Sequence, residues 1–177
     1  AGVFGEVRAD YKGLASLSVT GRWDWTSTLL YEYSPYFYPS ITGGVTLSEL
    51  IPGMTDTKND WFSYLKLRGN WAMVGKDAPA YLFDRRFGQY ATLPDGGYSY
   101  NPSFSTGFNL IPEMSSSWEV GVDVRFFAGR TRLDVAYYSI QTNNQIVTVR
   151  VPVTSGYVLQ TRNEGSVKNH GVEISLE

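Results

Sequence analysis

Few residues in this 177-residue chain have the types and spacing that catalysis or metal binding requires. The single histidine, His170, cannot form a multi-histidine metal site, and nothing in the sequence brings a nucleophile to it. We expect it to lie in a tight turn spanning Lys168 to Gly171. The chain has no cysteine, which removes disulfides and thiolate metal ligands.

Two carboxylates are the best remaining candidates for acid–base chemistry. Glu119 and Asp123 lie four positions apart in one alternating run, which places them on the same strand face roughly 13 Å apart. Both two-carboxylate geometries of glycoside hydrolysis need a shorter separation. The pairs Gly43-Gly44 and Gly96-Gly97 do not lead from a strand into a helix, so no phosphate loop is indicated. We therefore predict no catalytic residue, no cofactor, no bound metal and no enzymatic activity.

Composition favours strands and turns. The chain has 5 Trp, 13 Tyr and 9 Phe together with 18 Gly, residue types that are common in strands and in the turns between them. Its 15 basic and 17 acidic residues give a net charge of -2, which argues against a nucleic-acid partner because such a surface needs a basic excess.

Alternation of apolar and polar residues predicts about seven strands. The runs are 2–11, 14–25, 37–47, 63–74, 118–126, 132–138 and 165–176. The one helical candidate, 48–62, is broken by Pro52-Gly53 and is interpreted as a connection. No run of about 20 apolar residues indicates a transmembrane helix. Residues 1–10 do not have the pattern of a signal peptide.

The connections between the predicted strands differ in length. The turns at Lys12-Gly13 and Gly129-Arg130 are very short, whereas 26–36, 75–114 and 143–162 are long. Segment 48–61 is intermediate in length and interrupts the strict alternation of short and long connections. Short turns at one end and long loops at the other are typical of outer-membrane barrels, although soluble sandwiches also have unequal loops.

Each predicted strand has one polar and one apolar face, and two structures fit that pattern. In a soluble sandwich the apolar face packs in a core, whereas in a membrane barrel it meets lipid and the polar face lines the lumen. The candidate lumen-lining residues are Lys66, Arg68, Glu119, Asp123 and Arg125. The candidate lipid-facing residues are Leu65, Leu67, Trp71, Val120, Val122, Val124, Leu133 and Val135.

Aromatic residues near the predicted strand ends favour the barrel, because interfacial belts of Trp and Tyr lie there. These residues are Trp23, Trp25, Tyr64, Trp71, Trp118, Tyr137 and Tyr138. The alternative is that they fill a sandwich core. Seven strands cannot close a bacterial barrel, so a membrane protein with this sequence must be part of something larger.

Several ordered motifs resemble one family. The run NLIPEMSSSWEVGVDVRFF (109–127) resembles the Asn-Leu-x-Pro-Glu…Trp-Glu-x-Gly-x-Asp-x-Arg-Phe-Phe stretch of the SusC/RagA family of TonB-dependent outer-membrane transporters. RLDVAYYSIQTNNQIV (132–147) and NEGSVKNHGVEISL (163–176) resemble its next segments. Upstream, RWDWTSTL, YFYPSITGG and LKLRGNWAMVGKD match in order and spacing, with Lys76 where Asn is usual.

The resemblance implies an all-β fold, an antiparallel transmembrane β-barrel segment of about seven strands. It would belong to a larger, 22-stranded barrel with short periplasmic turns and long extracellular loops. Residues 1–177 would then be an internal part of one TonB-dependent receptor barrel domain, toward its C-terminal half. The signal peptide, the plug domain and the final barrel strands would be absent.

The resemblance also implies an importer of oligosaccharides or peptides in the bacterial outer membrane. Its partners would be a SusD-like lipoprotein lid, TonB acting on a part of the protein outside 1–177, the lipid bilayer with lipopolysaccharide, and a glycan or peptide substrate. The alternative function is that of a soluble all-β carbohydrate-binding sandwich module.

Loop 75–114 is the best candidate for contact with a ligand or the lid, because its aromatic side chains suit stacking on sugars or packing on peptides. The same side chains could instead pack the loop on itself. The candidates are Tyr81, Phe83, Arg85, Arg86, Tyr90, Tyr98 and Tyr100.

Overall fold

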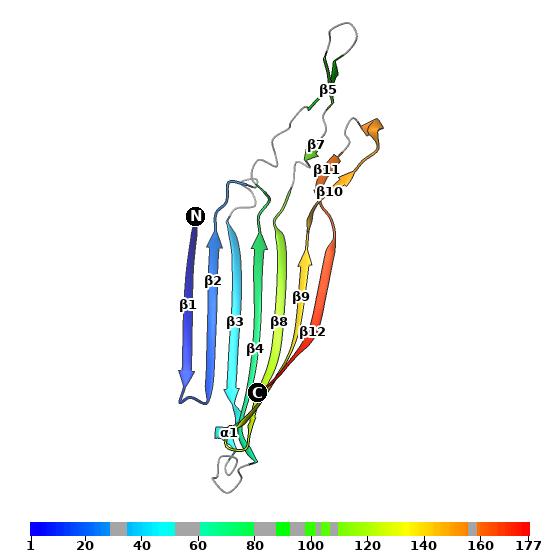
Figure 1. The fold of residues 1–177 in the computed structure, drawn as a ribbon. Coiled ribbons are helices and arrows are strands. Elements are labelled where there is room, and N and C mark those ends of the chain that lie inside the picture. Colours follow the sequence, from blue (N-terminus) through cyan, green and yellow to red (C-terminus); the bar gives the residue numbers. More distant parts are fainter. Residues whose placement is uncertain are drawn as a thin grey trace.

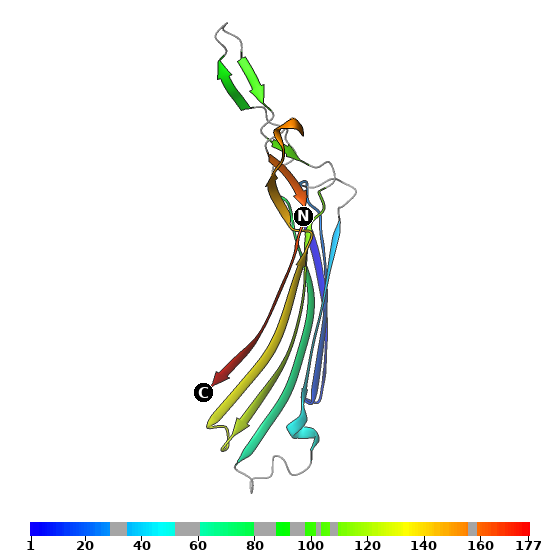
Figure 2. The ribbon, with the colours of Figure 1, turned by 90° about the vertical axis from the view of Figure 1, so that its right-hand side faces the viewer.

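The computed structural model describes residues 1–28, 35–51, 61–79, 88–92, 98–101, 104–106, 110–155 and 159–177. Its main body is a seven-stranded antiparallel sheet with the strand order β1-β2-β3-β4-β8-β9-β12, a single curved layer with open edges at β1 and β12 (Figures 1 and 2). The strands are β1 (Gly2–Tyr11), β2 (Ala15–Asp24), β3 (Tyr36–Thr46), β4 (Phe62–Lys76), β8 (Glu113–Phe126), β9 (Thr131–Asn143) and β12 (Ser166–Leu176). The predicted all-β fold with about seven main strands is confirmed.

Shorter elements lie within the connections, where the sequence predicted only loops. A two-stranded hairpin consists of β5 (Gly88–Thr92) and β6 (Tyr98–Asn101). A three-stranded sheet has the order β10 (Ile146–Arg150), β11 (Leu159–Asn163) and β7 (Phe104–Thr106). The helical elements are α1 (Leu47–Leu50) and a 3-10 turn at Val153–Ser155. Within the described ranges, no helix is long and apolar enough to cross a membrane.

The two short turns are tight because their residues adopt left-handed backbone conformations. Lys12 and Gly13 have φ angles of 48° and 72°, and the Leu14 amide donates to the Tyr11 carbonyl at 2.8 Å. Two successive positive φ angles closed by such a bond define the hairpin turn whose twist matches that of the flanking strands. The second turn follows β8, where Phe127 and Ala128 have φ angles of 53° and 54°.

The two ends of the sheet carry different connections (Figure 1). The β1–β2 and β8–β9 turns lie at the same end as α1, which belongs to the β3–β4 connection. The connections that contain β5–β7 and β10–β11 extend from the opposite end. The β3–β4 connection, which contains segment 48–61, therefore lies at the end with the short turns. Its position agrees with an alternation of connections between the two ends of the sheet.

Two local predictions were wrong. No turn interrupts the last strand: Lys168 to Gly171 pair continuously with residues 138–141 of β9, and His170 lies opposite Ser139 in mid-strand. The run predicted as 118–126 begins earlier, at Glu113, because Ser115–Ser117 continue the ladder with β9. Serine has little strand preference of its own, so the neighbouring strands rather than local propensity determine this segment.

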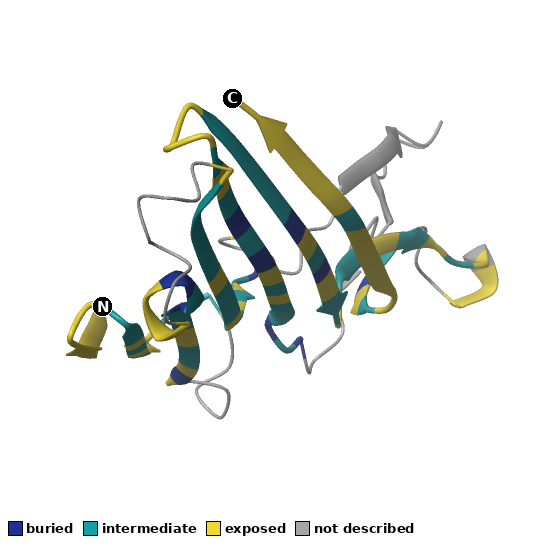
Figure 3. Ribbon diagram, turned by 90° about the horizontal axis from the view of Figure 1, so that it is seen from below, coloured by how far each residue is buried: buried dark blue, intermediate teal, exposed yellow. Residues whose placement is uncertain are grey.

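The apolar residues of the main sheet are mostly not buried. Among the described residues, one buried hydrophobic cluster consists of Tyr36, Ala78 and Leu110, with Tyr38 and Ile146 packed against it. Val120 and Ile174, by contrast, are 54% and 69% exposed although they lie on strands. Figure 3 shows the edge strand β12 exposed along most of its length. A sandwich core needs a second layer over the apolar face, and the described part of the chain provides none.

At the long-connection end, hydrogen bonds tie the small sheet to the large one. The Asn163 side chain accepts from the Ile111 amide at 2.9 Å and donates to the carbonyls of Ile111 and Asn144 at 2.7 and 2.8 Å. The Glu113 carboxylate accepts from the Ile146 amide at 2.8 Å. These bonds hold β10 and β11 above the ends of β8 and β9.

The fold predicts how residues 1–177 behave when they are produced alone. An uncovered apolar face and two unpaired sheet edges favour association in water. We expect the isolated chain to sediment as aggregates in buffer and to become monodisperse in a mild detergent, as measured by analytical ultracentrifugation. A folded monomer in plain buffer would contradict this and favour the soluble sandwich.

Candidate functional site

The register of the central strands brings the predicted residues onto two opposite faces. On one face, Lys66 of β4 lies opposite Asp123 of β8, and Asn70 lies opposite Glu119. Arg68 and Arg125 lie on the same face by alternation. All five predicted lumen-lining residues thus share one surface, which we call the polar face.

The predicted lipid-facing residues lie on the opposite surface, which we call the apolar face. Across three strands, Leu65 pairs with Val124 and then Leu133. Two positions further along, Leu67 pairs with Val122 and then Val135. Trp71 and Val120 lie on the same surface, with Trp71 opposite Trp118 and Val120 opposite Gly69. All eight predicted residues share the apolar face.

An ion-pair network on the polar face begins at Arg68. Its guanidinium donates two hydrogen bonds to the carboxylate of Asp134 on β9, at 2.6 and 2.8 Å. Its Nε atom lies 3.6 Å from Glu119 on β8. Such a bidentate pair fixes the direction of the arginine side chain as well as its charge partner. Arg68 therefore links β4, β8 and β9.

The network continues through Asp123, which is the one buried charged residue in the described part of the chain. Arg132 of β9 donates to it at 3.0 Å, and Arg125 Nε lies 3.8 Å from it. Arg132 also lies 3.6 Å from Asp134 and so joins the two halves. Because the three carboxylates of this network each have an arginine beside them, the network carries charge without an unpaired buried ion.

Gly121 makes the reach of Arg68 possible. It lies between Arg68 and Ala136 in the ladder, so the arginine crosses it to reach Asp134 two positions further along β9. A Cβ atom at Gly121 would come within 2.8 Å of Arg68 Nε. Any side chain at this position must displace the guanidinium.

Arg132 and Asp134 belong to the network but were not among the predicted site residues. The signal that finds them is the alternation of β9, which puts both on the side opposite Leu133 and Val135. The sequence did not show which residues of β8 pair with which residues of β9. Only that register brings Asp123 opposite Asp134.

A hollow of about 400 Å³ lies on the polar face beside this network. The side chains that line it from this face combine carboxylates, an amide and a hydroxyl with an aromatic ring. They are Asn70, Ser117, Glu119, Tyr138, Ile140 and Glu173. Such groups hydrogen-bond polar ligands and provide one ring face for stacking.

Five of the seven predicted interfacial aromatics fit the apolar face, and two do not. Trp118 packs on Tyr137 with ring centroids 5.3 Å apart, and Trp71 donates to the Ser116 hydroxyl at 3.2 Å. Trp23 packs on Phe37 at 4.3 Å, and Trp25 follows β2 in the same alternation.

Tyr64 and Tyr138, by contrast, lie on the polar face because they fall at the other parity of their strands. The Arg125 guanidinium lies 4.6 Å from the Tyr64 ring. The proposed position near strand ends is also wrong for some residues, since Tyr137 lies in the middle of β9 (Thr131–Asn143).

The predicted ligand-contact or lid-contact residues are only partly described. Tyr81, Phe83, Arg85 and Arg86 lie outside the described residues. Tyr90 lies on β5, and Tyr98 and Tyr100 lie on the paired strand β6. This hairpin projects from the long-connection end (Figure 2).

A one-layer, two-faced antiparallel sheet with unequal ends defines a segment of a membrane β-barrel. The family model of the TonB-dependent receptor-like β-barrel matches residues 1–177, and the chain belongs to this family. Receptors of this family are outer-membrane barrel proteins, so the chain is part of an outer-membrane barrel. The described sheet is open, as expected for part of a larger barrel.

The chain is similar to other TonB-dependent receptors in sequence and to a solved peptide importer in fold. The chain is 29% identical to TonB-dependent receptor P26 of Formosa agariphila, over 99% of this chain and 18% of that protein. It is 28% identical to TonB-dependent receptor SusC of Bacteroides thetaiotaomicron, over 94% of this chain and 18% of that protein. The structure of the RagAB peptide importer in its closed-closed state superposes with a TM-score of 0.83 at 21% identity, covering 99% of this chain and 19% of that chain. The chain thus spans less than a fifth of these relatives.

The close approach at Gly121 predicts a specific stability difference. Gly121→Ala should displace Arg68, whereas Gly69→Ala adds a Cβ that meets its neighbours at an ordinary 3.7 Å. In the full-length protein in detergent, we expect Gly121→Ala to be less stable than Gly69→Ala by about 1 kcal/mol. Heat-modified gel mobility measures the two unfolding midpoints.

A background that lacks the guanidinium provides the control. With Arg68→Met already present, the two alanine variants should unfold at equal temperatures. If the difference persists without Arg68, the close approach is not its cause.

Proposed function

We propose that residues 1–177 form one section of the wall of a TonB-dependent importer. Their polar face lines the lumen, and their apolar face meets the lipid of the outer membrane. The observation that carries this proposal is the segregation of the two faces across seven strands in a single layer. A sheet of this kind is stable only where something other than water covers the apolar face.

The unequal ends support an orientation. Barrels of the outer membrane have short turns on the periplasmic side and long loops outside. We therefore place the β1–β2 and β8–β9 turns at the periplasm, and the β5–β6 hairpin and the β10-β11-β7 sheet at the cell surface. In this orientation, the section is an internal part of the barrel domain.

The transported substrate is proposed to be an oligosaccharide or a peptide. The SusC and RagAB relatives support this class, since one of them is described as a peptide importer. A SusD-like lipoprotein lid and TonB would be the partners of the full-length protein, with bilayer lipid and lipopolysaccharide around the barrel. The polar-face hollow beside Tyr138 has hydroxyl, amide and carboxylate groups that suit such polar cargo.

The proposed role is transport without catalysis. The network that holds Glu119 and Asp123 pairs both carboxylates with arginines. Carboxylates held by arginines in this way link neighbouring strands and leave neither oxygen pair free to act as a catalytic acid or base. The supporting family relationship is likewise to receptors and transporters.

Single-cysteine labelling distinguishes the two faces. In outer membranes that contain the full-length protein, without other reactive cysteines, Leu67→Cys and Val122→Cys should react with a lipophilic maleimide and resist a charged one. Asn70→Cys and Glu119→Cys should show the reverse order of reactivity. The physical reason is that alternate positions along a barrel strand face different solvents.

Equal reactivity of all four positions with the charged maleimide would contradict the membrane assignment. Resistance of Leu67→Cys and Val122→Cys to both reagents would favour the soluble alternative, in which protein covers the apolar face. A cysteine at Arg130 in the short turn serves as a positive control for the charged reagent, because that residue is exposed.

The surface hairpin predicts a separation of ligand and lid binding. Tyr98 and Tyr100 both belong to β6. We expect the Tyr98→Ala/Tyr100→Ala variant to bind peptide or glycan about thirtyfold more weakly, since stacking rings contribute on the order of 1 kcal/mol each. Isothermal titration measures ligand affinity, and co-purification measures retention of the lid. Unchanged ligand affinity would exclude the hairpin from the binding site.

A further inference from the structure

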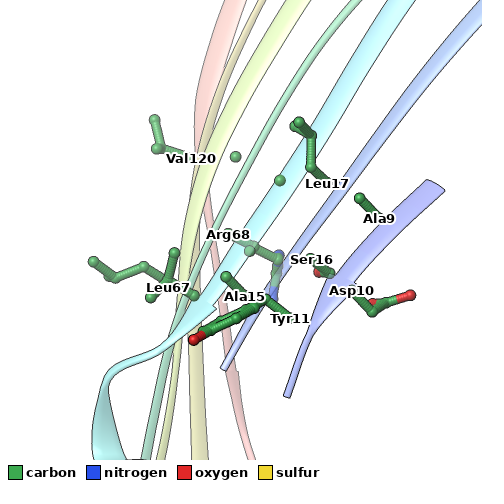
Figure 4. A pocket seen from close by; sticks show the side chains of 13 residues that line it. Ala9, Asp10, Tyr11, Ala15, Ser16, Leu17, Leu67, Arg68 and Val120 are labelled. Carbon is green, nitrogen blue, oxygen red and sulfur yellow. The ribbon is translucent and has the colours of Figure 1, made fainter. Parts of the chain in front are cut away.

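A groove of about 690 Å³ lies in the apolar face, near its short-turn end (Figure 4). Its lining is almost entirely apolar. Figure 4 shows Leu67 and Val120 on one side, Ala9 and Leu17 on the other, and Tyr11 across the lower end. The volume lies within the range of small-molecule sites. The face around the groove carries apolar side chains that project outward from the sheet.

Two rows of the ladder create the groove. One row runs Ala9, Leu17, Gly43, Gly69 and Val120 across five neighbouring strands. Its two central positions are glycines side by side, so no side chain covers the width of two strands there. The next row toward the turn includes Tyr11, Ala15 and Leu67. The groove is therefore a gap in the side-chain layer, bounded by larger residues.

The glycines at the floor are not required by the backbone. Neither has a left-handed φ angle, and a Cβ at Gly43 or Gly69 would meet its nearest atoms at an ordinary 3.7 Å. A larger residue would therefore fit at either position, and the space above the two glycines is left open. This differs from Gly121 on the other face, where the Arg68 guanidinium occupies the space.

A cation lies at the turn end of the groove. The Lys12 ammonium lies 5.6 Å from the centroid of the Tyr11 ring, which itself borders the groove. No ion pair involves Lys12 among the described residues. Asp10, which also borders the groove, lies on the polar face and is paired with Arg8 at 3.4 Å.

We propose that this groove binds one acyl chain of an anionic glycerophospholipid whose phosphate contacts the Lys12 ammonium. The inference rests on the proposed function, which places the apolar face in lipid and the Lys12 turn at the periplasmic boundary. The apolar lining takes the chain, and the cation at the turn end of the groove takes the head group. Attraction of this kind between an interfacial lysine and an anionic lipid adds to the packing of the chain.

A second copy of the protein would be the competing occupant of an apolar surface. The charge at the groove end favours the lipid, since a flat protein contact leaves the Lys12 cation without an anionic partner. The groove is also a gap in the side-chain layer over two glycines, bounded on both sides by larger apolar side chains, which suits an acyl chain.

The test uses the full-length protein, purified in mild detergent, stripped of lipid and then titrated with dioleoyl phosphatidylglycerol under native mass spectrometry. The wild type should retain one lipid. Filling the floor with Gly43→Val/Gly69→Val should abolish this retention. Lys12→Gln should weaken it about fivefold, the loss expected for one interfacial cation.

Two matched variants provide the controls. Gly5→Val adds the same side chain to the apolar face of β1, where a Cβ meets nothing within 4 Å. Arg130→Gln removes a cation from the other short turn, at the same end of the sheet. Both should retain the lipid as the wild type does. Heat-modified gel mobility confirms that every variant is folded.

Full retention by the double-valine variant, or no retention by the wild type, overturns the proposal. If the wild type is a dimer in the same mass spectra, and the double-valine variant becomes monomeric but keeps its lipid, the groove binds a second copy of the protein and the proposal is overturned. Substrate uptake by the same cells is measured separately. Uptake that fails while lipid is retained counts against the proposed function alone, and lipid loss with normal uptake leaves that function intact.

Discussion

The pairing of β4 with β8 is the constraint on which both faces of the sheet depend. It sets Leu65 opposite Val124 and Lys66 opposite Asp123, so that apolar residues meet apolar residues and charges meet charges. Because side chains alternate with a period of two, a shift of one residue would place every charge of one strand on the apolar face. The network from Arg68 to Asp134 forms only in the observed register, since the arginine must cross a position that has no side chain.

The two faces solve different physical problems with the same backbone. On the polar face, arginines and carboxylates on three strands neutralise one another, which allows Asp123 to be buried. On the apolar face, valines, leucines and tryptophans remain uncovered by the described protein. A wall that separates lipid from a polar lumen requires both arrangements at once, and a single layer of strands provides them without a hydrophobic core of its own.

The two ends of the sheet differ in the connections that they carry. Tight turns with left-handed residues close one end with few atoms, whereas the other end carries additional strands that Asn163 and Glu113 tie to the barrel wall. Loops positioned by a rigid scaffold are where binding residues concentrate. The buried cluster of Tyr36, Ala78 and Leu110 lies at this end, and Ile146 of β10 packs against it.

The sequence by itself determined the seven long strands of the main sheet, the short turns and the two faces of each long strand, because alternation and turn-forming residues are local properties. It did not determine the short strands β5–β7, β10 and β11. The motif resemblance added the family. The sequence did not determine that Lys168 to Gly171 continue a strand, that Ser115–Ser117 extend β8, or that Arg132 and Asp134 complete the network. It also did not show that Gly43 and Gly69 lie side by side. These features depend on which residue of one strand lies opposite which residue of the next, and only the tertiary structure decides that register.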